Sequence, residues 1–284
     1  MTNTYIPPKV WVPDNNTSGK WGSINRPVSG ARYEQALPVG EHDLQLYSLA
    51  TPNGQKITIM LEELLALGKD AEYDAYLIDI SKGEQFSSGF VKINPNSKIP
   101  ALVDRSDSQE LAVFESASIL LHLAEKFDAF LPKEREARTH TFNWLFWLQG
   151  SAPYLGGGFG HFYVYAPEKL AYPINRFSME VKRELDVLDK QLARHQYIAG
   201  DKITIADFAT WPWYGSLVLG NLYHADKFLQ TKTYTNVERW AKELADRPGF
   251  VRGRTVNRTQ GEIWEKVPER HNAADITNVL KLKP

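Results

Sequence analysis

Two kinds of hydrophobic periodicity alternate in the first half of the chain, over residues 44–131. Leu44–Ala50 and Tyr73–Ile80 alternate apolar with other residues, which predicts two β-strands. Between them, Lys56–Leu67 carries its apolar side chains on one helical face, and Gly68 follows it as a typical helix-ending residue. A strand, a helix and a strand of this length predict a βαβ unit with a right-handed crossover.

The segment from Asn94 to Phe127 completes this half. Its runs ALV and LAVF are short and apolar, and a polar turn rich in Asp and Ser separates them, which predicts two strands joined by a hairpin. Behind them, Ser116–Phe127 has apolar residues at helical spacing. The complete order is βαβ followed by ββα over residues 44–130, an α/β arrangement of the thioredoxin-like kind.

After Leu131 and Pro132 the pattern predicts helices only. Thr204 and Asp207 have the spacing of a capping box before an apolar run. The glycine-rich run Tyr154–His161 breaks the helical pattern, and no Lys-Ser or Lys-Thr follows it as in a phosphate loop, so a hinge or a close approach between helices is the favoured interpretation. The predicted helices cover Glu134–Gln149, Tyr172–Gln196, the run after Thr204, and Tyr234–Arg247.

These patterns divide the chain into an N-terminal extension (1–43), an α/β domain (44–131), an all-helical domain (132–260) and a C-terminal tail (261–284). The extension is rich in Pro, Gly and Asn, yet Tyr5, Trp11, Trp21 and Tyr33 are too many aromatic residues for a solvated tail. We therefore expect it to wrap around the body or a partner subunit. The basic stretch 247–258 is expected to be solvated or to pack against a subunit, and the C-terminal tail is expected to be loose.

Composition narrows the class of protein. The chain has 284 residues, is 43% hydrophobic and has a formal net charge of −1, so it can bury the cores of two domains and shows no bias towards nucleic acid or charged membranes. No apolar run approaches the ~20 residues of a membrane helix, and the first residues lack the features of a signal peptide, so a cytoplasmic location is expected. The scattered histidines lack ligand spacing, which argues against a metal site.

The chain contains no cysteine. That composition excludes structural disulfides, zinc–thiolate sites, a CxxC redox pair and a cysteine nucleophile. Any thiol chemistry must therefore use the sulfur of a bound small molecule.

Two dipeptides in the segment 94–127 carry candidate chemistry. A cis Ile99–Pro100 bond before a strand would leave the neighbouring backbone free to pair with an extended ligand, although most such bonds are ordinary trans turns. Glu115 and Ser116 stand where a strand turns into a helix, and the N–H groups of a helix N-terminus suit a carboxylate; the plain alternative is a helix cap. Together they predict a site for a short peptide with a free α-carboxylate.

Longer runs carry a family resemblance. The chain resembles glutathione transferases of the bacterial nu class, in their subgroup of disulfide-bond oxidoreductases, in the runs SLATPNGQKITIMLEELLALG, QFSSGFVKINPNSKIPALVD, NWLFWLQGSAPYLGGGFGHFYVYAP, GDKITIADFATWPW and, in the extension, INRPVSG. The resemblance covers residues 44–250 and the extension motif. It implies a thioredoxin-like α/β domain with a mixed four-stranded sheet, an all-α C-terminal domain, and glutathione as the cofactor.

The same resemblance implies the roles of residues in a first glutathione site. Thr51 and Asn53, with Pro52 between them at the start of the first predicted helix, would stabilise the thiolate of glutathione rather than abstract a proton; a plain N-cap is the alternative. The remaining implied contacts are Ile99 to the cysteinyl main chain beside a cis Pro100, Glu115 and Ser116 to the γ-glutamyl end, and Gln85 and Lys98 to the glycyl end.

Members of the subgroup bind a second glutathione, and the matching residues here are Asn25, Gln149 and Arg176, with Arg26 as a further candidate. A solvated arginine is the alternative for Arg176. The implied function is a glutathione-dependent disulfide-bond reductase that acts on small disulfides. Each subunit of a homodimer would hold two glutathiones or one oxidised glutathione.

Two other functions stay open. Conjugation of glutathione to electrophiles, or reduction of organic hydroperoxides, needs one activated glutathione and an apolar second pocket. The candidates to line such a pocket are Trp147, Tyr154, Phe159, Phe162 and Tyr165. A non-catalytic protein that carries ligands or docks a partner is the other alternative, and the presence of Thr51, Asn53, Glu115 and Ser116 together argues against it.

Overall fold

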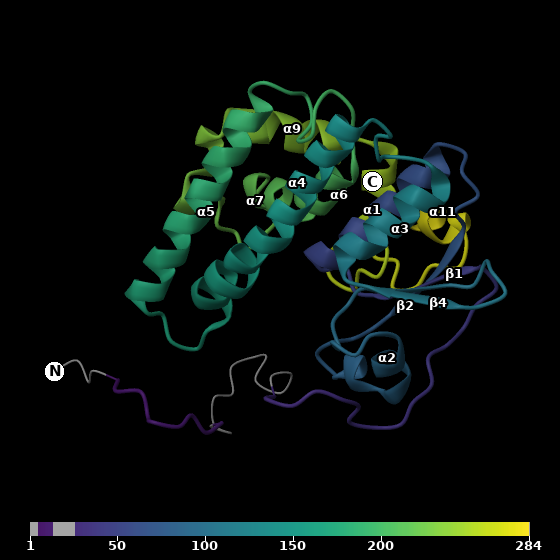
Figure 1. The fold of residues 1–284 in the computed structure, drawn as a ribbon, viewed down its shortest axis with the longest axis horizontal. Helices are drawn as coiled ribbons and strands as arrows, with labels where there is room; N and C mark the ends of the chain where they lie inside the picture. Colours follow the sequence, from purple (N-terminus) through teal and green to yellow (C-terminus); the bar gives the residue numbers. More distant parts are fainter. Residues whose placement is uncertain (1–4, 14–25, 284) are drawn as a thin grey trace.

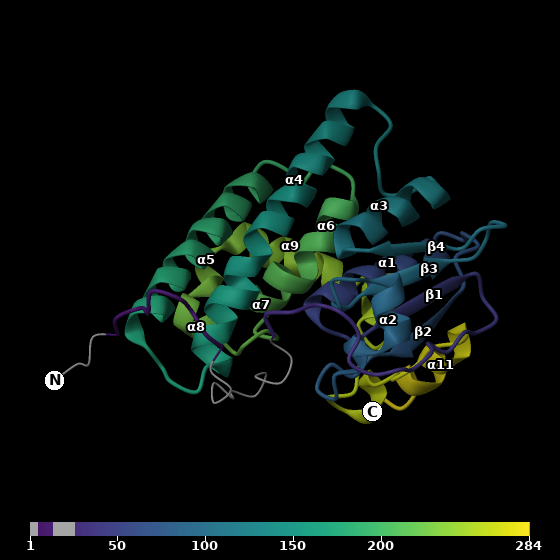
Figure 2. The same cartoon turned by 60° about the horizontal axis from the view of Figure 1, so that its bottom comes forward.

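The computed structural model describes residues 5–13 and 26–283. Its first half is built around a four-stranded sheet with the strand order β2-β1-β3-β4 (Figure 1 and Figure 2). β1 (Leu44–Ser48) pairs in parallel with β2 (Tyr73–Leu77) and antiparallel with β3 (Ala101–Asp104), which pairs antiparallel with β4 (Leu111–Phe114). The mixed sheet confirms the predicted thioredoxin-like fold class.

Helices cover both faces of this sheet. Helices α1 (Pro52–Ala66) and α3 (Ser116–Phe127) lie on one face, and α2 (Ser88–Ile93), preceded by the short 3-10 helix η2 (Glu84–Phe86), lies on the other (Figure 1). Successive side chains of a strand point to opposite faces. Leu46 therefore packs in the core beneath α1, whereas its neighbour Tyr47 packs in a separate core with Phe90 of α2.

The second half consists of helices, as predicted. They are α4 (Arg135–Pro153), the π-helical η3 (Tyr154–Tyr165), α5 (Ala171–Leu192), α6 (Ile205–Thr210), the π-helical η4 (Trp211–Gly215), α7 (Ser216–Val218), α8 (Asp226–Leu229), the 3-10 helix η5 (Thr231–Thr233) and α9 (Thr235–Ala245). The predicted capping box is confirmed, because the buried Asp207 carboxylate accepts from Thr204 N at 2.9 Å and also from Trp240 Nε1 at 3.0 Å. Across the described residues, no helix combines the length and apolar character needed to cross a membrane.

The glycine-rich run does not break the helix, contrary to the prediction, but continues α4 directly as η3. Its glycines allow aromatic rings to pack on the helix backbone: an added Cβ would stand 2.6 Å from the Trp213 ring at Gly156 and 2.4 Å from the Phe177 ring at Gly158. The predicted close approach between helices is thus present. Tertiary packing outweighs the intrinsic cost of glycine in a helix, about 1 kcal/mol per residue.

The basic stretch 247–258 also differs from its prediction, because it packs within this chain. It forms α10 (Pro248–Gly253), whose Phe250 is buried. Gly253 lies so close to α1 that an added Cβ would stand 2.5 Å from Ile59 backbone atoms. The stretch therefore belongs to the core between the two domains rather than to a solvated surface.

The C-terminal segment, expected to be loose, is docked on the α/β domain. It contains the 3-10 helix η6 (Ile263–Glu265) and α11 (Ala273–Leu280). Arg270 is fully buried, pairs with Glu62 of α1 at 3.2 Å, and exchanges two backbone hydrogen bonds with Ala75 of β2 at 2.7 and 3.1 Å. A buried carboxylate requires a cationic partner, and this segment supplies one.

The N-terminal extension lies against the α/β domain at Arg32 and Tyr33, as predicted, whereas Tyr5 and Trp11 are 76% and 66% exposed and are not covered by the described part of this chain. Tyr33 forms a β-bridge with Ser87, and Arg32 N donates to Phe86 O at 2.8 Å. The Arg32 guanidinium also lies 3.4 Å from the centre of the Phe86 ring. Trp21 lies outside the described residues. Residues 26–43 thus run along the α/β domain before β1 begins.

Candidate functional site

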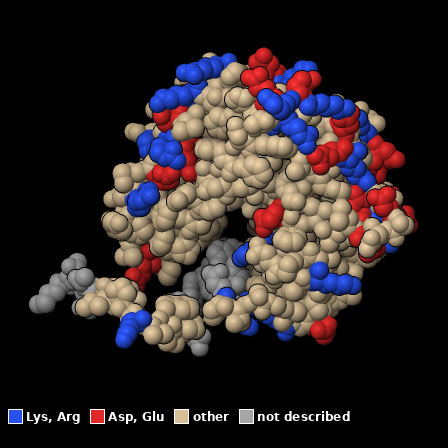
Figure 3. Space-filling view, in the orientation of Figure 1, with Lys and Arg blue, Asp and Glu red and all other residues tan. Residues whose placement is uncertain are grey.

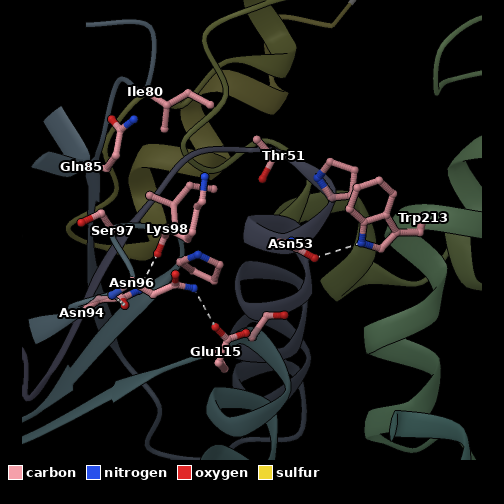
Figure 4. A pocket seen from close by; sticks show the side chains of 14 residues that line it. Thr51, Asn53, Ile80, Gln85, Asn94, Asn96, Ser97, Lys98, Glu115 and Trp213 are labelled. Carbon is pink, nitrogen blue, oxygen red and sulfur yellow. Dashed lines mark hydrogen bonds between the residues drawn. The ribbon is translucent and has the colours of Figure 1, made fainter. Parts of the chain in front are cut away.

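A cavity of about 330 Å³ opens where the α/β domain faces the helical domain (Figure 4). Nine of the predicted site residues line it: Thr51, Pro52, Asn53, Gln85, Lys98, Ile99, Pro100, Glu115 and Ser116. Five further lining residues were not predicted: Ile80, Asn94, Asn96, Ser97 and Trp213. The fold thus brings together five segments of the sequence, four from the α/β domain and one, at Trp213, from the helical domain.

The N-terminus of α1 forms one wall of the cavity. Thr51 is its N-cap and accepts from Gly54 N at 3.4 Å, so the plain capping role exists, while the hydroxyl proton stays available for a ligand. Gly54 is required for this turn, because an added Cβ would stand 1.9 Å from Leu49 O. Asn53 and the positive end of the α1 helix dipole face the cavity, an arrangement that lowers the pKa of a thiol placed there.

The loop before β3 forms a second wall. The Ile99–Pro100 peptide bond is cis, which confirms the prediction. Asn94 holds the loop from inside, since its Nδ2 donates to Lys98 O at 2.6 Å and its Oδ1 accepts from Asn96 N at 2.9 Å. The signal for this role was the Asn-Pro-Asn sequence, which is typical of a side-chain-stabilised turn.

The third wall is the start of α3. Glu115 precedes the helix with φ 68°, a left-handed value that costs a non-glycine residue of the order of 1–3 kcal/mol and is found chiefly at functional sites. Its carboxylate accepts from Asn96 Nδ2 at 3.3 Å and is exposed to the cavity (Figure 4). Ser116 follows as the first residue of α3. Here a carboxylate and a helix N-terminus stand side by side, which suits the ammonium and carboxylate of one amino-acid head.

A buried lysine supports this wall and was missed from the sequence. Lys56 of α1 is 1% exposed, and its Nζ donates to Ser116 Oγ at 3.1 Å and to Gln149 Oε1 at 3.3 Å. Burial lowers its pKa from 10.5 to about 7, an effect that the nearby Glu115 carboxylate opposes. Gln149, a predicted site residue, does not line the cavity but reaches it through Lys56. The lysine lies among apolar helix positions, where the sequence pattern gives no sign of a function.

The other residues predicted for a second glutathione lie further away. Arg176 of α5 is exposed, stands 3.9 Å from Glu180 and does not line the cavity. Arg26 is exposed, and Asn25 lies outside the described residues. Figure 3 shows that the molecule is hollowed between its two halves, and that the walls of the hollow are mostly uncharged. None of the five aromatic candidates for an apolar pocket lines the 330 Å³ cavity, and Phe159 is fully buried.

The α/β half with its cis-proline loop and the helical half behind it define a glutathione transferase. The family model of the glutathione S-transferase N-terminal domain matches residues 42–125, and that of the C-terminal domain matches residues 171–243. The chain is 64% identical to the disulfide-bond oxidoreductase YghU of Escherichia coli K12 over 96% of this chain and 95% of that protein. It therefore belongs to the glutathione transferase family.

Two solved structures extend the comparison. The glutathione transferase YghU from Streptococcus pneumoniae, complexed with glutathione, is 58% identical and superposes with a TM-score of 0.87 over 91% of this chain and all of that one. A glutathione transferase from Pseudomonas putida, with one glutathione disulfide bound per subunit, is 34% identical with a TM-score of 0.70 over 76% of this chain and 93% of that one.

Proposed function

We propose that this chain binds glutathione in an extended pose along the cavity. The observation that carries the proposal is the meeting of three features in one cavity: the α1 N-terminus, the cis-proline loop, and the Glu115–Ser116 start of α3. Glu115 and Ser116 hold the γ-glutamyl ammonium and carboxylate, and the Ile99 main chain pairs with the cysteinyl unit. Gln85 and Lys98 hold the glycyl end. The glutathione complex of the Streptococcus relative supports this assignment.

At the α1 end the sulfur becomes a thiolate. The helix dipole, the Thr51 hydroxyl and the Asn53 amide stabilise the negative charge, because hydrogen bonds to an ion are roughly twice as strong as neutral ones. Threonine is no base at neutral pH, so the thiol proton leaves to solvent. A modest lowering of the thiol pKa suits thiol–disulfide exchange, since nucleophilicity falls together with pKa.

We further propose that the reaction is disulfide reduction by two glutathiones. The bound thiolate attacks one sulfur of a substrate disulfide, forms a mixed disulfide, and expels the other sulfur as a thiolate that takes a proton from solvent. The thiolate of a second glutathione then attacks the glutathione sulfur of the mixed disulfide. Oxidised glutathione and the second substrate thiol leave. The protein contributes position and electrostatics, and glutathione contributes all the sulfur, as a chain without cysteine requires.

The second glutathione is assigned to the hollow beside the first site, with Asn25, Gln149 and Arg176 as its partners and Arg26 as a further candidate. The oxidised glutathione bound in each subunit of the Pseudomonas putida relative supports two adjacent glutathionyl sites. In this chain Gln149 already contacts Lys56, which also contacts Ser116 of the first site. The two sites would thus share one buried lysine.

A paired assay tests this function. Purified protein is given reduced glutathione with a small hydroxyalkyl disulfide in one arm, and with an aromatic chloride in the other. We expect oxidised glutathione to form in the first arm at a much higher rate than conjugate forms in the second. Conjugation alone would favour the transferase alternative. An equal rate when an organic hydroperoxide replaces the disulfide in the first arm would favour the peroxidase alternative. Glutathione binding without turnover would favour a ligand carrier.

We also propose that the protein is a homodimer of the bacterial nu class and works in the cytoplasm. Exposed apolar side chains support the dimer: Leu111 and Phe114 on β4 and Phe146 on α4 are 51%, 37% and 63% exposed. A reaction that consumes reduced glutathione needs a compartment that keeps thiols reduced, which supports the location. Light scattering at micromolar concentration tests the dimer, and a monomer mass would contradict it.

A further inference from the structure

One hydrogen bond joins the proposed thiolate site to the helical domain. Trp213 Nε1 of η4 donates to Asn53 Oδ1 of α1 at 2.9 Å, across 160 positions in the sequence (Figure 4). Trp213 is 9% exposed and lines the cavity beside Asn53. This contact therefore belongs to the site, although the sequence pattern marks Trp213 only as a core residue.

The chemistry of the contact decides which way the Asn53 amide faces. An indole nitrogen can only donate, so the amide atom opposite it must be the oxygen. The nitrogen Nδ2 lies on the other side of the same planar group and is turned away from Trp213. Among the described residues Nδ2 has no hydrogen-bond partner, and Asn53 is half-buried in the cavity wall. A polar N–H donor is thus kept free at the start of α1.

Trp213 is held in place by the glycine run. Its ring lies against the backbone of η3 at Gly156, where an added Cβ would stand 2.6 and 2.9 Å from two ring carbons. The neighbouring Gly157 has no atom within 4 Å of an added Cβ. Both glycines lie in η3, so an alanine at either position has the same kind of helical backbone. Only at Gly156 would its methyl group meet the Trp213 ring.

We propose that Trp213, seated on Gly156, is a positioning residue that turns the Asn53 amide so that Nδ2–H donates to the sulfur of bound glutathione. This inference rests on the proposed function. Rotation of the amide by half a turn would present its oxygen to the thiolate, which is repulsive. Trp213 excludes that orientation, because the oxygen would then leave the indole N–H unpaired in a buried place. The helical domain thereby sets the acidity of a thiol that the α/β domain binds.

The test measures the pKa of the bound thiol, which a purely structural role of Trp213 would not move. The far-ultraviolet absorbance of the thiolate is followed against pH in wild type, Trp213→Phe, Gly156→Ala and the matched control Gly157→Ala. Affinity for S-methylglutathione, which has no ionisable thiol, is measured by calorimetry on the same samples. Asn53→Ala provides the reference for complete loss of the amide donor.

We expect Trp213→Phe and Gly156→Ala each to raise the thiol pKa by about one unit, a roughly tenfold loss of thiolate at pH values below both pKa values. Their affinity for S-methylglutathione should stay within about twofold of wild type. Gly157→Ala should match wild type in both measurements. Trp213→Phe removes the indole N–H, whereas Gly156→Ala displaces the Trp213 ring. If one of these variants fails to fold, the other still tests the inference.

Two results would overturn the inference. The first is an unchanged thiol pKa in Trp213→Phe and Gly156→Ala, whether or not Asn53→Ala raises it. The second is a roughly tenfold loss of affinity for S-methylglutathione in these two variants, as large as their loss of thiolate. Such a loss would mean that the substitutions damage the whole binding site. Neither result touches the proposed binding of glutathione, which instead fails if the wild type binds no glutathione.

Discussion

The buried lysine behind the site makes a prediction about stability and pH. Lys56 has a pKa of about 7 in the folded protein because burial disfavours its charge, against 10.5 for an ordinary lysine. Between these values the unfolded chain binds a proton at this position and the folded chain does not. Stability therefore rises with pH across the window, by about 1.4 kcal/mol per pH unit and about 5 kcal/mol in all. Below a pH of about 7, the pKa in the folded protein, the loss of stability caused by burying this lysine is constant. Above the pKa in the unfolded chain that loss is absent.

The variant Lys56→Met keeps most of the side-chain volume and removes the titration. Urea unfolding at a fixed protein concentration, at roughly pH 7.5 and pH 9, gives the free energy of unfolding of each protein. We expect the value for wild type to rise relative to that of Lys56→Met by about 2 kcal/mol between the two pH values. Lys190→Met, which removes an exposed lysine, serves as the control for the loss of a surface charge.

If the free energy of unfolding changed with pH by the same amount in wild type and in Lys56→Met, the reasoning would be refuted. They would mean that Lys56 stays charged in the folded state, held so by Glu115 or by water. The same experiment with bound glutathione is informative. A glutathione carboxylate near Ser116 favours the charged form of Lys56. The difference between wild type and Lys56→Met in how the free energy of unfolding changes with pH should therefore become smaller.

Three further predictions concern single residues. Glu115→Ala should weaken glutathione binding in calorimetry by more than about 1.5 kcal/mol, the lower end for a charge-assisted bond, and unchanged affinity would remove Glu115 from the site. Thr51→Ala should lower disulfide-reductase turnover by roughly one to two orders of magnitude; full activity there with none in Asn53→Ala would make Asn53 the principal donor to the thiolate. Burial raises the pKa of Glu184, hydrogen-bonded by Tyr214 at 2.6 Å, to about 7. The free energy of unfolding of the wild type therefore falls as pH rises from about 4.5, the pKa in the unfolded chain, to about 7. The melting temperature of Glu184→Gln should rise relative to that of wild type only across this pH window.

The sequence allowed the α/β domain to be predicted well because its periodicity is local. Each strand and helix of the sheet half shows its buried face within a window of a few residues. The helix α2 escaped the analysis, since its six residues are too few to show a period. Tyr154–Tyr165 was assigned as a helix break because glycine is a poor helix former, yet rings that arrive from distant segments stabilise it. The C-terminal tail was expected to be loose, because Glu62, the partner of its Arg270, lies 208 positions earlier in the sequence.

The same limit applies to the site. The residues of the cis-proline loop and of the α3 start were found, because helix starts and Xaa-Pro pairs are readable signals in a sequence. Lys56 and Trp213 were missed, since each stands in an apolar stretch and looks like part of the core. Their roles come from contacts across the domain boundary, with Gln149 and Asn53 respectively. No local pattern encodes such contacts.

The docked C-terminal segment also protects the molecule from self-association. β2 is an outer strand of the sheet, and an outer strand with free N–H and C=O groups is a template for pairing with another chain. Arg270 occupies the middle of that edge through its two backbone bonds to Ala75. Removal of residues 261–284 would uncover the edge and take away Arg270, one of the two arginines paired with Glu62 among the described residues. Shortening this protein at its C-terminus should therefore turn a protected sheet edge into a seed for aggregation.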